Sequence, residues 1–213
     1  MFNCKYCGIE NDEGNSFCSN CGNLLVKEGE NKIILTLKII GRGVINPHTY
    51  IRNSKNLDLI YSGIMSGILL IIYLLQSFFL SRTISMNIPI IKTSDILLGS
   101  ILINALYLVV NTVICYGVLR VLKRNVRIRE IINIYLFASI ITNILAIVPI
   151  LIVKISITIA FFLLFICVFF GYGIIYIGLK DTLEVKTKYV FLVIMLCYVG
   201  NLIVNSVLTE IFM

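Results

Sequence analysis

Five long apolar runs fill most of the chain after residue 58. Read from one charged residue to the next, they cover residues 59–81, 96–119, 131–153, 155–179 and 189–209. Each run has about 21 to 25 residues, and a helix needs about 20 to cross the roughly 30 Å hydrocarbon core of a bilayer. The pattern predicts an all-α membrane protein with five transmembrane helices over residues 59–210. Only Lys154 separates the third run from the fourth, so we expect a tight hairpin there.

The composition excludes an ordinary soluble domain. Hydrophobic residues make up 59% of the chain and charged residues 14%, whereas a typical soluble domain is about half apolar and a quarter charged. The mean hydropathy of +0.98 agrees. Three of the seven cysteines, Cys115, Cys167 and Cys197, lie inside apolar runs, and we interpret them as small buried apolar residues.

The other four cysteines form the strongest local motif, over residues 1–23. Cys4 and Cys7, and then Cys18 and Cys21, are each separated by two residues and followed by a glycine. This spacing lets two thiolates reach one tetrahedral ion. About 20 residues cannot bury a sufficient core without a metal or disulfides. The motif therefore predicts a small C4 zinc ribbon with Cys4, Cys7, Cys18 and Cys21 as the zinc ligands.

Other chemistries are open to the same motif: an iron site of the rubredoxin type, a redox dithiol pair, or two disulfides. Structural zinc is favoured because four protein ligands close the site and leave no position for catalysis. Ribbons often bind nucleic acid, but this one carries Lys5 against Glu10, Asp12 and Glu13. A net acidic head is a poor phosphate binder, so we expect no nucleic acid.

The distribution of cations predicts the orientation in the cell membrane. Fifteen of the 18 Lys and Arg residues lie before the first run, between the second and third, or between the fourth and fifth; the other side receives only Arg82, Lys92 and Lys154. Because Lys and Arg favour cytoplasmic loops, we expect a cytoplasmic N-terminus and an extracytoplasmic C-terminus. A reducing cytoplasm also keeps cysteine thiolates available as metal ligands.

Residues 24–58 connect the head to the first span. Residues 32–53 are apolar with interspersed cations and contain no run long enough to cross a membrane. We interpret them as an amphipathic segment at the inner membrane face, attracted by anionic lipid; a packed juxtamembrane turn is the alternative. His48, the chain's single histidine, is expected to be a surface residue here.

Uncharged polar residues recur along the predicted spans, whereas the interiors of the spans contain no Asp, Glu, Lys, Arg or His. Such residues usually carry intramembrane chemistry, so we expect no enzyme activity. Gly63 and Gly67 form a G-x-x-x-G in the first span. Helix packing explains these patterns, and a polar path for a solute is the alternative. The polar residues form a stripe along one face of two of the spans. They are Ser100, Asn104, Tyr107 and Asn111 in the second span and Tyr198, Asn201 and Asn205 in the fifth.

The layout resembles the Yip1 family of five-span membrane proteins, in particular bacterial members with a zinc ribbon ahead of the Yip1 domain. The resemblance covers residues about 33 to 210. Locally it rests on Gly171-Tyr172-Gly173 and on Gly178-Leu179-Lys180 before a short basic loop. The Asp-Leu-Tyr-Gly-Pro signature of the eukaryotic branch has no counterpart, so the resemblance implies a fold and a location but no vesicle-trafficking role.

Together these patterns predict a non-enzymatic membrane protein whose ribbon docks a cytoplasmic protein partner or organises the membrane. The alternative is a small transporter or channel component in which Asn104, Asn111, Asn201 and Asn205 line a path. A metal or redox sensor with a labile ribbon is a third hypothesis.

The orientation and the metal can be tested together by thiol labelling and metal analysis. We expect Cys4, Cys7, Cys18 and Cys21 to resist an impermeant thiol reagent in intact cells and to react after permeabilisation and chelation. The purified chain should release about one zinc, because four thiolates complete one tetrahedral shell. Labelling from outside, or a protein without metal, would instead favour an extracytoplasmic disulfide module.

Overall fold

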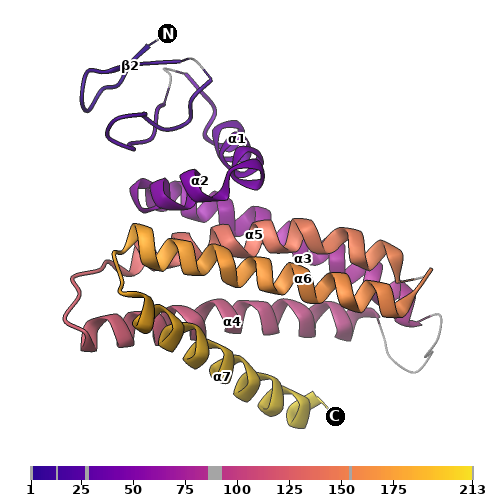
Figure 1. The fold of residues 1–213 in the computed structure, drawn as a ribbon. Coiled ribbons are helices and arrows are strands. Elements are labelled where there is room, and N and C mark those ends of the chain that lie inside the picture. Colours follow the sequence, from indigo (N-terminus) through magenta and orange to yellow (C-terminus); the bar gives the residue numbers. More distant parts are fainter. Residues whose placement is uncertain (1, 13, 27–28, 86–92, 154, 213) are drawn as a thin grey trace.

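Five long helices form the body of the molecule over the residues that the computed structural model describes, 2–12, 14–26, 29–85, 93–153 and 155–212. All five are long and apolar enough to cross a membrane. The predicted fold class is confirmed: the chain is a multi-pass α-helical membrane protein with a small four-cysteine head before its first span. The helices are α3 (Leu59–Ser85), α4 (Thr93–Val121), α5 (Ile128–Ile152), α6 (Ile157–Ile177) and α7 (Thr187–Phe212) (Figure 1).

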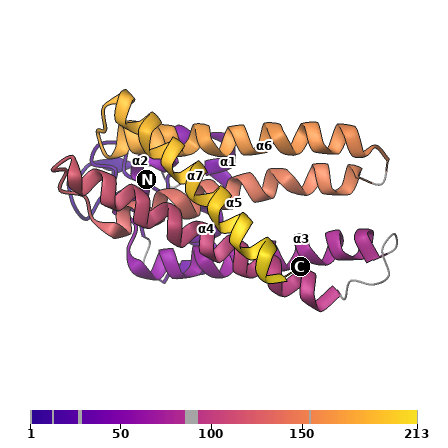
Figure 2. The ribbon, with the colours of Figure 1, turned by 90° about the horizontal axis from the view of Figure 1, so that it is seen from below.

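The third and fourth spans are adjacent antiparallel helices, α5 and α6 (Figure 2). Helix α5 ends at Ile152 and α6 begins at Ile157, and Lys154 lies outside the described residues. Ser156 starts α6, because its Oγ accepts a hydrogen bond from the N–H of Ile159 at 3.4 Å. A serine at this position satisfies one of the N–H groups that a helix start leaves free.

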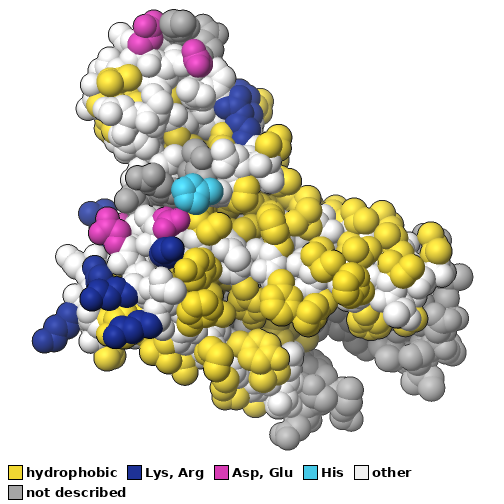
Figure 3. All heavy atoms as spheres, viewed as in Figure 1, with side chains coloured by type: hydrophobic (Ala, Val, Ile, Leu, Met, Phe, Trp, Pro, Cys, Tyr) yellow, Lys and Arg dark blue, Asp and Glu magenta, His cyan; other side chains and the backbone are white. Residues whose placement is uncertain are grey.

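One end of the bundle carries the basic connections, and we call it the basic end. It contains the α4–α5 connection, residues 122–127, and the α6–α7 connection, which opens with the short π-helix η2 (Gly178–Thr182). Lys and Arg side chains gather at this end in the space-filling view (Figure 3). His48 lies here too, 55% exposed, with its Nε2 3.1 Å from Oδ2 of Asp181. The histidine is a surface residue, as predicted.

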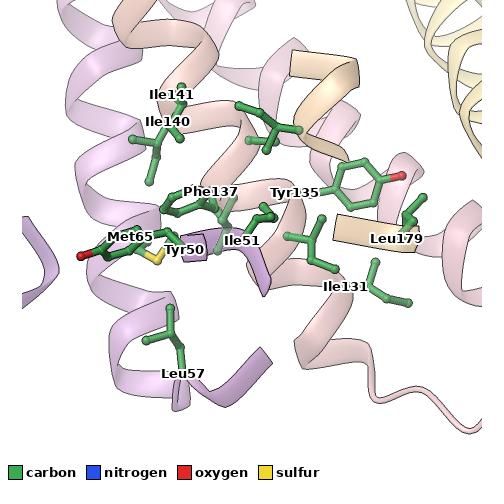
Figure 4. Packing of buried hydrophobic residues seen from close by; sticks show 14 of the residues in the cluster. Tyr50, Ile51, Leu57, Met65, Ile131, Tyr135, Phe137, Ile140, Ile141 and Leu179 are labelled. Carbon is green, nitrogen blue, oxygen red and sulfur yellow. The ribbon is translucent and has the colours of Figure 1, made fainter. Parts of the chain in front are cut away.

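The segment between the head and the first span is helical and packs on the bundle. Helix α1 (Lys32–Ile45) begins where the Asn31 side chain accepts a hydrogen bond from the N–H of Ile33 at 2.8 Å. Pro47 opens α2 (Pro47–Asn53), and one 3-10 turn, η1 (Ser54–Asn56), leads into α3. Ile51 of α2 is fully buried among side chains of α5 and Leu179 (Figure 4).

Helix α1 has two apolar faces. Its inner face, which includes Leu35, Ile39 and Ile40, is buried against the bundle. Its outer face leaves Ile33 and Ile34 more than half exposed. An amphipathic helix with an exposed apolar strip and interspersed lysines is suited to the membrane interface.

The buried amide of Asn133 in α5 joins this segment to the bundle. Its Nδ2 donates to the carbonyl oxygens of Ser54 at 3.0 Å and Leu57 at 3.2 Å. Its Oδ1 accepts a hydrogen bond from Ser62 Oγ at 2.6 Å. Asn133 is fully buried, and this network satisfies its polar atoms, which would otherwise cost free energy in an apolar environment.

Close helix approaches occur at glycines other than the predicted pair. A Cβ on Gly63 or Gly67 would meet no described atom within 4 Å. By contrast, a Cβ on Gly171 would lie 2.4 Å from Thr142 Oγ1, and one on Gly178 would lie 2.6 Å from Ile134 Cγ2. Within the described chain, Gly171 of α6 and Gly178 of η2 therefore allow the close packing that sequence analysis assigned to α3.

The packing of α1 can be tested with two glycines on the same helix. A Cβ on Gly43 would lie 2.1 Å from Cζ of the buried Phe137, whereas one on Gly41 would meet nothing within 4 Å. We expect Gly43→Ala to lower the free energy of unfolding by about 1 to 3 kcal/mol, because overpacking forces neighbours to shift. Gly41→Ala should be neutral or slightly stabilising, because alanine favours helix.

The measurement is thermal unfolding of both purified variants in detergent micelles, followed by circular dichroism. Equal melting temperatures for the two variants would mean that α1 is not packed against Phe137.

Candidate metal centre

The head is built from two copies of one turn. In the first, the N–H of Cys4 donates to Ile9 O at 2.8 Å and the N–H of Gly8 donates to Cys4 O at 2.8 Å. The second repeats this pattern, Cys18 to Asn23 at 2.8 Å and Gly22 to Cys18 at 3.0 Å. Both glycines have a positive φ, +75° and +69°, which a residue without Cβ adopts easily.

Short strand pairs close each turn. Strand β1 (Phe2–Asn3) pairs antiparallel with β2 (Glu10–Asn11) around the first, and a bridge joins Phe17 to Leu24 around the second. Leu25 is buried with Cys4 and Cys18 in a small cluster. The head thus includes Leu24 and Leu25, which follow the 1–23 boundary expected from sequence.

The two turns bring all four predicted ligands together. The Sγ atoms of Cys4, Cys7, Cys18 and Cys21 all lie within 4.8 Å of one another. Cys4 Sγ lies 3.7 Å from Cys21 Sγ, and Cys7 Sγ lies 3.5 Å from Cys18 Sγ. Tetrahedral zinc at about 2.3 Å from each sulfur would separate the sulfurs by roughly 3.8 Å. The four thiols therefore fit one metal ion.

Amide groups of two asparagines donate hydrogen bonds to the sulfurs of the cluster. The Nδ2 of Asn11 donates to Cys18 Sγ at 3.5 Å, and the Nδ2 of Asn23 donates to Cys21 Sγ at 3.4 Å. The backbone N–H of Cys21 is the largest of several hydrogen bonds that lower the pKa of Cys18 to about 6, against the opposing effect of burial. Low-pKa thiols of this kind bind metal with little proton competition near pH 7.

Asn11 also fastens the two turns to each other. Its side chain is 4% exposed. Its Nδ2 donates to Ile9 O at 2.8 Å in the first turn, and its Oδ1 accepts from the N–H of Ser19 at 2.9 Å in the second. Sequence analysis did not identify Asn11 or Asn23, because only the folded turns bring their amides to the sulfurs.

The second turn of the head contacts the membrane domain. The ring of Phe17 packs edge-on against that of Tyr50 in α2, with centroids 5.3 Å apart. The Nδ2 of Asn56 in η1 donates to Gly22 O at 3.0 Å. Between the head and helices α1 and α2 lies a cavity of about 650 Å³. The second turn of the head is thus positioned by the segment that Asn133 holds.

The predicted polar stripes of α4 and α7 face each other in the bundle. Asn104, Asn111 and Asn201 line one cavity, and the hydroxyl of Tyr107 donates to Asn205 Oδ1. Tyr198 is 53% exposed and lies outside the cavity lining. Ser100 has no described side chain. The stripes therefore serve both hydrogen bonding across helices and the lining of a cavity.

Comparison with known proteins adds no assignment. No protein-family model matches the chain, and no match was found among curated proteins or solved structures.

The amide of Asn11 provides a test of the metal centre beyond its ligands. We expect Asn11→Ala to weaken zinc binding by about 10- to 100-fold, because partners that orient metal ligands have effects of this size. Asn3→Ala, at an exposed position of β1, is the control and should bind zinc as the wild type does. Competition with a chromophoric chelator on the purified chain measures both affinities. Equal affinities for the two variants would contradict the role assigned to Asn11.

Proposed function

We propose that the chain is a non-enzymatic protein of the cell membrane whose head binds zinc and docks a cytoplasmic protein partner. The observation that carries the proposal is the unequal placement of the two turns of the head. The second turn, Cys18 to Gly22, faces helices α1 and α2 across the cavity between them. The first turn leaves Tyr6 72% exposed and Ile9 43% exposed, which is a large apolar surface for so small a unit.

The charge on the exposed surface of the first turn indicates the chemistry of the partner. Glu10 and Asp12 are exposed, and acidic side chains gather at the end of the head farthest from the membrane helices (Figure 3). An aromatic side chain beside carboxylates favours a protein surface that presents Lys or Arg around an apolar contact. The same charge disfavours nucleic acid.

The cytoplasmic location is supported by the position of the head. Its contacts to α2 and η1 place it beside the basic end, where His48 meets Asp181. Cations favour the cytoplasmic side of a membrane, and a reducing compartment favours thiolates.

The absence of catalysis is supported by the ligand set. Four thiolates fill a tetrahedral shell and leave no position for a substrate. Zinc rather than iron is proposed because closed C4 shells in short turns are typical of structural zinc. The five-span topology also supports membership in the Yip1 family, which we propose on that layout alone.

Site-specific photo-crosslinking in living cells tests the docking function. We expect a photoreactive benzoylphenylalanine in place of Tyr6 to capture a protein, because this side chain lies on the free face of the head. Glu10→Lys with Asp12→Lys should reduce the yield at least tenfold while zinc content stays unchanged, since only the charge of the docking face is altered.

The same photoreactive residue in place of Phe78, which faces outward from α3 at 48% exposure, is the control and should yield lipid adducts only. Cys4→Ser with Cys7→Ser should abolish protein capture. A captured protein that persists in both charge-reversed and cysteine variants would count against docking by the folded head.

A further inference from the structure

A second cavity, of about 290 Å³, lies inside the membrane domain. We call it the intramembrane pocket. All five spans line it, from Tyr73 of α3 to Asn201 of α7. Asn104 and Asn111 lie in the middle third of α4, and Cys197 and Asn201 in the middle third of α7. The pocket is therefore near the centre of the bilayer, where helical transporters also place their binding sites.

The lining is polar and aromatic. Tyr73, Tyr107, Tyr135 and Tyr172 contribute to it, together with amides from three helices. None of the described residues that line the pocket carries a charged side chain. Polar groups in the centre of a membrane domain cost free energy unless they are hydrogen-bonded or functional. The hydrogen-bond partner of each polar atom therefore matters.

Most of these atoms are satisfied within the bundle. Thr142 Oγ1 donates to Ala138 O at 2.8 Å, and Asn143 Nδ2 donates to Ser139 O at 2.8 Å. The Tyr135 hydroxyl lies 3.3 Å from Cys197 Sγ. These contacts explain the polar residues of α5 by packing alone.

Two amide oxygens of the lining residues lack such a hydrogen bond. The Oδ1 atoms of Asn111 and Asn201 are buried and accept a hydrogen bond from none of the described residues. Both residues line the pocket. A buried acceptor without a donor is destabilising, and leucine at either position would remove the cost. Both acceptors belong to residues that line one cavity, which indicates an occupant that supplies the donors.

We propose that the intramembrane pocket binds a neutral, hydroxyl-bearing group about the size of one sugar ring or a glycerol. The lining has no counter-ion for a charged ligand, amide oxygens accept from hydroxyl groups, and tyrosine rings cover the apolar faces of a small polyol. The volume is at the lower limit for small-molecule pockets, which start at roughly 300 Å³. The group belongs to a free solute or to the headgroup of a membrane amphiphile.

The pocket reaches the molecular surface beside Val168 of α6. Helices α6 and α7 meet at Tyr176 and Phe191, with ring centroids 5.7 Å apart, near the basic end. From there α7 diverges from α6 (Figures 1 and 2). Val168 of α6 lines the pocket and is 48% exposed, so the pocket reaches the surface at this residue.

Fluorescence of a single tryptophan tests the proposal. The natural chain contains no Trp, so Val168→Trp places one reporter where the pocket reaches the surface. The full-length protein is placed in phosphatidylcholine nanodiscs, because this headgroup has no hydrogen-bond donor. Glucose and glycerol are the free probes, and octyl glucoside, below the concentration that disrupts nanodiscs, is the amphiphilic probe. We expect a saturable change in fluorescence with at least one of them.

Leucine substitutions separate binding from packing. Asn111→Leu and Asn201→Leu, each in the reporter background, should weaken binding at least tenfold while the melting temperature stays equal or rises. Tyr198→Leu is the control: it belongs to the same predicted stripe but lies outside the lining, and it should leave affinity within twofold. Saturation by glucose or glycerol identifies a free solute, and saturation by octyl glucoside alone identifies an amphiphile.

Two results would overturn the proposal. The first is no saturable change with any probe, which means a cavity that holds water only. The second is unchanged affinity in the Asn111→Leu and Asn201→Leu variants, which means that the probes bind elsewhere.

Discussion

The hydrogen bonds of Asn133 hold an irregular stretch of backbone against the membrane helices. Residues 54–58 leave one helix and enter another, so among the backbone hydrogen bonds that the described residues make outside helices and strands the carbonyl of Leu57 accepts none and that of Ser54 accepts only from the N–H of Leu57. In or near hydrocarbon, each such group needs a partner, and the Asn133 amide provides one for Ser54 and one for Leu57. The position of η1, and with it the contact of Asn56 to the head, depends on this one buried side chain.

The polar residues of the spans fall into two groups that differ in purpose. Asn133 is satisfied by η1, Leu57 and α3 and so specifies how these parts fit together. Thr142 and Asn143 donate to carbonyls of their own helix, α5, and Asn143 also donates to the Tyr73 hydroxyl of α3. Asn111 and Asn201 have amide oxygens without a donor among the described residues, so they lower stability instead of raising it. Proteins retain local conflicts of this kind mainly at functional sites.

The spans and the four-cysteine cluster could be predicted from sequence because both signals are local. About 20 consecutive apolar residues predict a membrane span, and two cysteines separated by two residues predict a metal-binding turn, without knowledge of the rest of the fold. The shared face of Asn104, Asn111 and their neighbours followed from helical periodicity in the same way. That they line a cavity depends on where α5 and α6 lie, which periodicity does not encode.

The remaining features depend on contacts between distant residues. Gly43 is close to Phe137, 94 positions later (137 − 43), whereas Gly63 and Gly67 have the familiar spacing and no close neighbour among described residues. Asn11 and Asn23 acquire their roles because folding brings their amides to Cys18 and Cys21. Small residues and amides acquire their roles from the tertiary structure, so their sequence pattern alone is ambiguous.

The attachment of the head through Phe17 and Gly22 has a consequence for its energetics. Only six residues, 26–31, separate Leu25 from α1. Six residues reach at most about 20 Å when fully extended, so a detached head would remain at a high effective concentration beside α1 and α2. Contacts such as the Phe17–Tyr50 ring pair and the Asn56–Gly22 hydrogen bond can therefore keep the head in place at a strength that would not join two separate proteins.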